Sequence, residues 1–229
     1  MQVEINIPTG LNEITLKQYQ EFVKVKNENN DALFVKQKLV SIMCRINLAV
    51  VASIRAKDFE DIVGAISRLF DLDCKLQTEI KIADKTFGFI PDLENMSLAE
   101  FVDLDETIKD WSTFNRAMAV LYRPITKQDK SKRYLIEEYN GSATYSEVME
   151  HVTMDVVFGA TAFFLTLGNE CLNLLVDFLE KETSRKDFQT LASQHNLQND
   201  GVGISQSISY LREILQSLMT LQGSHSLNL

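Results

Sequence analysis

Residues 87–125 separate two halves of the chain that are predicted to be mostly helical. The segment begins Phe87-Gly88-Phe89-Ile90-Pro91-Asp92-Leu93-Glu94-Asn95-Met96-Ser97-Leu98-Ala99-Glu100 and ends Ala117-Met118-Ala119-Val120-Leu121-Tyr122-Arg123-Pro124-Ile125. It contains the single tryptophan, Trp111, and two of the three prolines. Ser97 is followed three residues later by Glu100, which is the spacing of a capping box and predicts that a helix starts here.

A β-hairpin is predicted just before this helix. Residues 76–82 alternate apolar and polar side chains, residues 83–85 form a turn, and residues 86–90 return as a strand that Pro91 ends. Val3, Ile5 and Ile7 alternate in the same way and predict a strand over residues 3–7. Because an isolated hairpin is marginal in water, it should pair with that strand, pack on helices, or add to a partner's sheet.

Helices account for most of the remaining chain. Thr15 with Gln18 gives a second capping box, Asp31 is a further N-cap, and residues 58–70 repeat apolar side chains at helical spacing. Nine glycines and three prolines in 229 residues favour long helices over many short strands. We therefore expect a mainly α (α+β) fold: a helical bundle with a small antiparallel hairpin or three-stranded sheet from residues 3–7, 76–82 and 86–90.

Three segments are expected along the chain. Residues 1–125 form a helical domain with the hairpin, residues 126–145 form a polar loop or linker, and residues 146–229 form a helical segment that packs on the first part. Residues 204–221 predict a last amphipathic helix. That helix either packs within its own bundle, lies in a partner's groove, or self-associates.

Composition argues against two classes of partner. The formal net charge of −9 opposes nucleic-acid binding, which needs a basic face. A local basic run is interpreted as a solvated loop; it consists of Lys127, Lys130, Lys132 and Arg133. The most apolar run, residues 156–167, is shorter than the roughly 20 residues that span a bilayer, so we expect no membrane insertion and a buried helix instead.

The sequence gives little sign of catalysis. The cysteines Cys44, Cys74 and Cys171 are far apart and predict buried free thiols, with no metal site and no cofactor. An acidic cluster, Asp103 with Asp105 and Glu106, is interpreted as surface or helix-cap charge. His151 lies four residues before Asp155, so a histidine–carboxylate pair is an alternative to an exposed helix histidine. We predict that the chain is not an enzyme.

Interaction is the remaining class of function. The aromatic and aliphatic side chains of the hairpin and of the following stretch are the predicted partner-binding residues, namely Phe87, Phe89, Ile90 and Trp111. The hairpin edge would then augment the sheet of another protein.

Two segments resemble proteins of tailed bacteriophages. The first is Pro8-Thr9-Gly10-Leu11-Asn12-Glu13-Ile14-Thr15-Leu16-Lys17-Gln18-Tyr19-Gln20. The second is the segment 87–125, with its pieces Phe87–Leu93, Glu100–Asp105 and Ala117–Ile125. These resemble small proteins encoded near the structural genes of tailed phages, including crAss-like phages of gut bacteria. The order of elements over roughly the first 125 residues is also similar to phage tail assembly chaperones.

The resemblance implies a non-catalytic role in virion or tail assembly. The partners would be other phage structural proteins, with self-association as a second mode, and the chain would act in the host cytoplasm. In one version it stays in the mature particle as a structural or packaged component. In the other it is a transient tail assembly chaperone that is absent from the particle. A small phage enzyme with a site near His151 is the alternative from another class.

Overall fold

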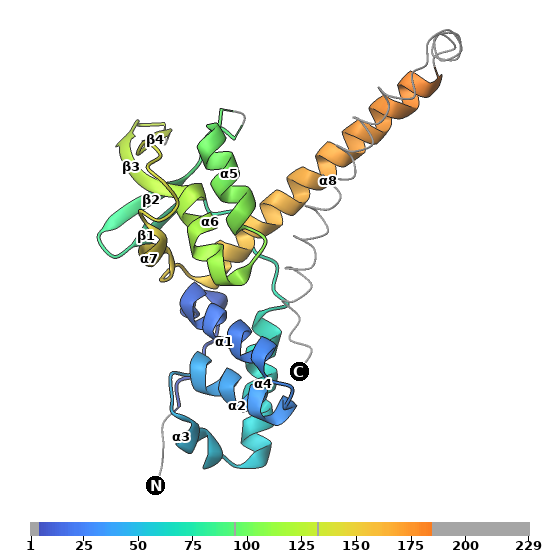
Figure 1. Cartoon of the computed structure of the whole chain (residues 1–229). Coiled ribbons are helices and arrows are strands. Elements are labelled where there is room, and N and C mark those ends of the chain that lie inside the picture. Colours follow the sequence, from blue (N-terminus) through green and yellow to red (C-terminus); the bar gives the residue numbers. More distant parts are fainter. Residues whose placement is uncertain (1–4, 94, 132, 185–229) are drawn as a thin grey trace.

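The computed structural model describes residues 5–93, 95–131 and 133–184. Within these residues it has eight α-helices, two 3-10 helices and one four-stranded antiparallel sheet. This confirms the predicted mainly α, α+β class and shows that the fold is not all-α. Figure 1 shows a lower group of helices, an upper group around the sheet, and one long helix that leaves from between them.

The lower group follows local sequence signals closely. It consists of η1 (Leu11–Glu13), α1 (Leu16–Glu28), α2 (Ala32–Met43), α3 (Leu48–Ala52) and α4 (Ala56–Leu69). The predicted capping box of Thr15 and Gln18 is present at the start of α1. Asp31 accepts hydrogen bonds from the amides of Leu33 and Phe34 at the start of α2.

The sheet has the order β1-β2-β3-β4, with every neighbouring pair antiparallel. Its strands are β1 (Glu79–Ile82), β2 (Lys85–Phe89), β3 (Tyr122–Gln128) and β4 (Tyr134–Ile136). The hairpin of β1 and β2 confirms the prediction. β3 pairs with β2, which leaves β1 at an edge of the sheet, and the apolar hairpin side chains Ile80, Phe87 and Phe89 are buried in the core.

The predicted third strand is wrong. Residues 5–7 are not in a strand, and residues 3 and 4 lie outside the described part of the chain. Its place beside β2 is taken by β3, in which Pro124 lies opposite Phe87. Proline lacks an amide donor and is rare in central strands, so the sequence does not predict a strand at this position. The segment 126–145, expected to be a loop or linker, contains the end of β3 and all of β4.

The upper helices are α5 (Leu98–Thr107), η2 (Trp111–Thr113), α6 (Phe114–Leu121) and α7 (Ser146–Met149). Ser97 and Glu100 form the predicted capping box of α5. The long apolar helix of the second half is α8 (Met154–Ser184). The expected helix over residues 204–221 lies outside the described residues.

An aromatic cluster joins the two groups of helices. The Tyr19 ring of α1 lies 4.8 Å from the Trp111 ring of η2 and 5.6 Å from the Phe70 ring, which follows α4. Phe158 of α8 lies 5.9 Å from Tyr19. The main chain adds to this junction, since the Leu16 amide donates to the Val152 carbonyl at 2.8 Å. The first and second halves of the described chain therefore share one core.

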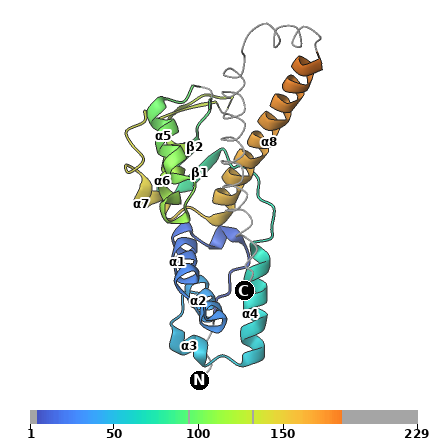
Figure 2. The same cartoon turned by 45° about the vertical axis from the view of Figure 1, so that its right-hand side comes forward.

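The environment of α8 changes along its length. Its first turns are buried, as at Val157 and Ala160, and burial continues to Leu165. Beyond that point the helix projects from the body as an arm, which is visible in both orientations (Figures 1 and 2).

The buried part of α8 passes very close to the segment before β1. A Cβ added at Gly159 would collide with the backbone carbonyl of Lys75. Backbone on that side cannot move as easily as a flexible side chain, so glycine is required by the close approach. Gly64 of α4 is different, because its added Cβ would meet only the end of the Arg68 side chain at 3.6 Å.

These two glycines give a matched test of the packing between α8 and the segment before β1. Gly159→Ala should destabilise the chain by about 1–3 kcal/mol, the usual cost of overpacking. Gly64→Ala should stabilise it by about 0.4–1 kcal/mol, since a helix interior favours alanine. Urea unfolding followed by circular dichroism measures both values. Equal changes in unfolding free energy for the two substitutions would contradict the close contact between Gly159 and the Lys75 backbone.

Candidate functional site

Helix α5 buries a charged side chain and exposes three apolar ones, which is unusual for a surface helix. Its inward side carries Glu100, Leu104 and Thr107, all buried. Its outward side carries Leu98, Phe101 and Val102, which are 79%, 51% and 43% exposed. Residues spaced by three and four share one face of a helix, so these three apolar side chains form a continuous surface, called here the α5 apolar triad.

The inward orientation of Glu100 is fixed by an ion pair. Its Oε1 lies 2.5 Å from Nη2 of Arg123 on β3, and both side chains are about nine-tenths buried. Its other oxygen, Oε2, accepts a hydrogen bond from the Ser97 amide at 2.7 Å. The Arg123 guanidinium also lies over the Tyr139 ring, 5.6 Å from its centroid. Both carboxylate oxygens are therefore paired, although Nε of Arg123 has no hydrogen-bond partner in the structure.

The charged form of Glu100 is favoured in this setting. Burial alone would raise the pKa of the carboxyl, but the hydrogen bonds from Ser97 and the positive charge of Arg123 outweigh it, and the pKa is lowered. Glu100 is therefore a carboxylate at neutral pH, and Arg123 has a permanent charge to pair with it. Buried charges are tolerated only when paired in this way.

A second contact holds the same side of α5. Asp103 accepts hydrogen bonds from the Tyr139 hydroxyl and, at 3.2 Å, from the Ser142 amide. The Tyr139 hydrogen bond is the main reason that the pKa of Asp103 is lowered. The pKa of Tyr139 is raised by burial and by its bond to Asp103, so the phenol stays protonated and remains a donor.

These contacts decide which side of α5 meets solvent. Turning the helix by half a rotation would bury the apolar triad, but it would leave Arg123 buried without Glu100 and Tyr139 without Asp103. An unpaired buried charge costs several kcal/mol, and the same rotation would expose Leu104, which offsets part of what burial of the triad returns. The polar anchors therefore keep Leu98, Phe101 and Val102 exposed.

The outward side becomes acidic after the triad. Asp105 follows on the same face and pairs with Lys109 at 2.9 Å, and Glu106 is exposed beside it. The three members of the predicted acidic cluster thus have different surroundings, since Asp103 is bonded to Tyr139 while Glu106 faces solvent. The resulting surface is apolar near the start of α5 and carries the charge of Glu106 beside the Asp105–Lys109 ion pair near its end.

The four predicted partner-binding residues lie in the core. Phe87, Phe89, Ile90 and Trp111 are all 5% exposed or less. Phe89 packs against the Phe163 and Phe164 rings of α8, at 5.6 and 6.2 Å. Because all four side chains are buried, they do not form a docking surface in this structure. Their apolar character reflects packing.

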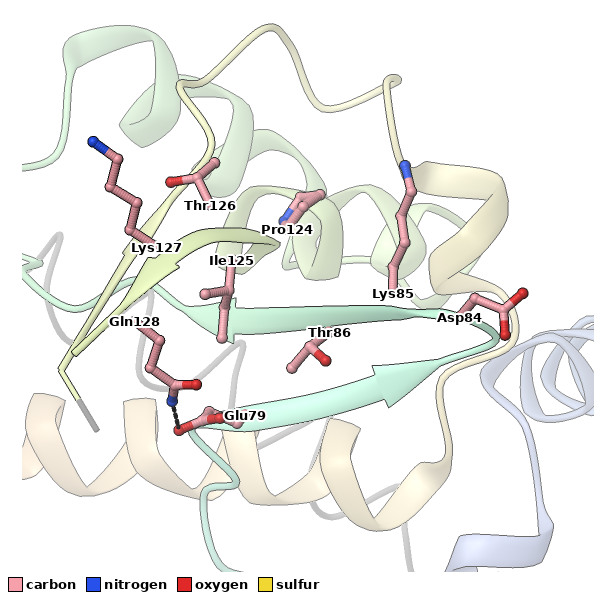
Figure 3. Close-up of a pocket in the computed structure, with 9 residues that line it drawn as sticks. All are labelled: Glu79, Asp84, Lys85, Thr86, Pro124, Ile125, Thr126, Lys127 and Gln128. Carbon is pink, nitrogen blue, oxygen red and sulfur yellow. Dashed lines mark hydrogen bonds between the residues drawn. The ribbon is translucent and has the colours of Figure 1, made fainter. Parts of the chain in front are cut away.

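An open cavity of about 560 Å³ lies over β1, β2 and β3 (Figure 3). Its charged side chains do not converge: Glu79 begins β1, while Asp84 lies in the turn at the other end of the hairpin. Gln128 donates a hydrogen bond to Glu79 at 2.9 Å. The remaining lining consists largely of Thr86, Pro124 and Ile125 around the middle of the strands. We find here no arrangement of a nucleophile with an adjacent base.

His151 is exposed and lines neither that cavity nor a larger one of about 760 Å³ between α1 and η2. Its predicted partner, Asp155, accepts a hydrogen bond from Gln77 at 2.7 Å. Cys44 is buried, which raises the pKa of its thiol to about 11, and Cys74 is half-buried. The side chain of Cys171 lies outside the described part of the structure.

Among the described residues, no group of three or more His, Cys, Asp or Glu side chains is arranged to hold a metal ion. No helix in this part of the chain combines the length and apolar character needed to cross a membrane. Of the basic run, Arg133 pairs with Asp129 at 2.9 Å, Lys127 lines the cavity of Figure 3, and Lys132 is not described.

The buried ion pair gives a direct stability test. Arg123→Met leaves the Glu100 carboxylate buried without its partner and should cost about 3–5 kcal/mol of unfolding free energy. The double variant Glu100→Leu/Arg123→Met removes both charges and should recover most of that loss. Arg55→Met breaks the exposed pair with Asp58 and should cost about 1 kcal/mol or less. Chemical denaturation measures all three, and similar costs for the two single variants would refute the assignment.

Comparison with family models, curated proteins and solved structures finds no match to this chain.

Proposed function

We propose that the chain is a non-catalytic bacteriophage protein that acts by binding another phage structural protein during virion or tail assembly. Its resemblance to phage structural-region proteins, carried by residues 8–20 and 87–125, supports the phage context. The observation that carries the binding role is the exposed α5 apolar triad. The proposed surface consists of Leu98, Phe101 and Val102, in place of the buried hairpin residues expected from the sequence.

The triad has the features of a small binding hot spot. A half-exposed aromatic side chain, Phe101, lies between two aliphatic ones on a helix whose rotation is fixed from behind. Aromatic anchors on rigid elements contribute most to binding, because little conformational freedom is lost on association. The α5 surface is therefore preorganised for binding in the free protein.

The charges beside the triad indicate the chemistry of the partner. Glu106 is exposed, the neighbouring Asp105 is paired with Lys109, and the whole chain has a formal net charge of −9. A complementary surface would accept the triad in an apolar groove and present lysine or arginine side chains toward the end of α5. Such a partner would associate faster at low ionic strength, because long-range attraction between opposite charges is screened by salt.

The proposal is tested in particles of the phage that encodes the chain. We expect stoichiometric amounts of the chain in purified particles by mass spectrometry. Phe101→Asp should lower incorporation about tenfold or more, because it places a charge in the apolar contact; tenfold corresponds to roughly 1.4 kcal/mol. Leu33→Asp is the matched control, since Leu33 is 58% exposed on α2, and it should incorporate normally.

Other outcomes separate the alternatives. Abundance in infected-cell lysate with absence from particles would replace the virion version by the transient tail assembly chaperone. Absence from both would contradict a phage function. Normal incorporation of a folded Phe101→Asp chain would show that the α5 apolar triad is not the binding surface.

A further inference from the structure

The projecting part of α8, residues 166–184, is called here the α8 arm. Leu165, just before it, is 5% exposed, whereas Leu167 and Leu174 within it are 36% and 70% exposed. These two leucines are seven residues apart and therefore lie on the same side of the helix. An apolar helix face of this kind is stable in water only when another element covers it.

The sequence of the arm has the spacing of a packed helix pair. Apolar residues recur in steps of three and four, at Phe164, Leu167, Cys171, Leu174 and Phe178. The end of the chain repeats the same pattern in steps of four and three, at Ile204, Ile208, Leu211, Leu215 and Leu218. A seven-residue repeat of this type lets two helices interlock their side chains along a shared seam.

The two patterns also agree in length. Phe164 and Phe178 are 14 residues apart, as are Ile204 and Leu218, so each helical seam would be about 21 Å long. The chain leaves α8 at Ser184, the far end of the arm, and residues 185–203 connect it to the second pattern. A connection within one chain gives an effective concentration in the millimolar range, which favours pairing within the molecule over pairing between molecules.

We propose that residues 204–221 of the same chain cover the α8 arm, returning along it with their apolar side against Leu167 and Leu174. This goes beyond the proposed function and does not depend on it. The α5 apolar triad, on a different helix, stays available to a partner.

The test uses the full chain and two double variants. Leu211→Asp/Leu218→Asp places two charges on the apolar side of residues 204–221. Ser209→Asp/Gln216→Asp is the matched control: it adds the same charge at the same spacing on the polar side. Amide hydrogen exchange, measured by mass spectrometry on peptides from residues 166–184 and 154–165, shows whether the arm is protected from solvent. Sedimentation velocity at several concentrations reports the oligomeric state.

In the wild-type chain and the control variant we expect slow exchange in the arm and a monomer at every concentration. In Leu211→Asp/Leu218→Asp, exchange in the arm should rise about tenfold or more while residues 154–165 stay protected. Three results would overturn the proposal. They are equal protection in both variants, fast exchange in the wild-type arm, and protection that appears only with a concentration-dependent dimer, which would make a second copy the cover.

Discussion

The ion pair between Glu100 and Arg123 determines how the upper half of the molecule meets its surroundings. Arg123 stands on a central strand of the sheet with its side chain buried, so it requires a carboxylate on the helix above it. Glu100 supplies that carboxylate and at the same time caps the helix to which it belongs. Because Glu100 must point inward, the opposite side of α5 must point outward, and that side is apolar. The exposed surface is thus a consequence of a buried polar contact.

Local signals in the sequence predict most of the helices and the hairpin. The capping residues Thr15, Asp31 and Ser97 act within one turn, so their effect can be recognised without knowledge of the rest of the chain. Contacts between distant segments are not accessible in that way. Arg123 and Glu100 are 23 residues apart on different elements, and no spacing rule links them. Strand β3 is likewise difficult to predict from the sequence, because it contains Pro124 and proline is rare in central strands.

Local sequence patterns also cannot distinguish buried side chains from those that bind a partner. Phe87, Phe89, Ile90 and Trp111 are large apolar side chains within residues 87–125, and such side chains are equally typical of cores and of interfaces. Deciding between them requires the fold. One sequence feature could have identified this surface: apolar residues occur on two sides of α5, at Leu98 and Val102 on one side and at Leu104 on the other. A helix that is apolar on two sides has a second surface to cover.

The α5 apolar triad and the α8 arm are both exposed apolar surfaces, but they differ in length and in sequence pattern. The α5 apolar triad is short, rigid and bordered by acidic side chains, which suits an external partner. The α8 arm is long and repeats its apolar residues with the spacing of the chain's own end, which suits internal cover. In this proposal the folded body holds the α5 apolar triad in place for a partner, which agrees with the proposed role in phage assembly.

The buried contacts of Glu100 and Asp103 keep Phe101 exposed to solvent on the opposite side of α5. Hydroxyl-radical footprinting of the free monomer, read by mass spectrometry, tests it most directly. Phe114 serves as the internal reference, since it is 1% exposed. The account predicts that Phe101 is oxidised about tenfold faster than Phe114, as expected for an exposed ring compared with a buried one. Equal protection of the two rings would contradict it, because α5 would then have its apolar side inward.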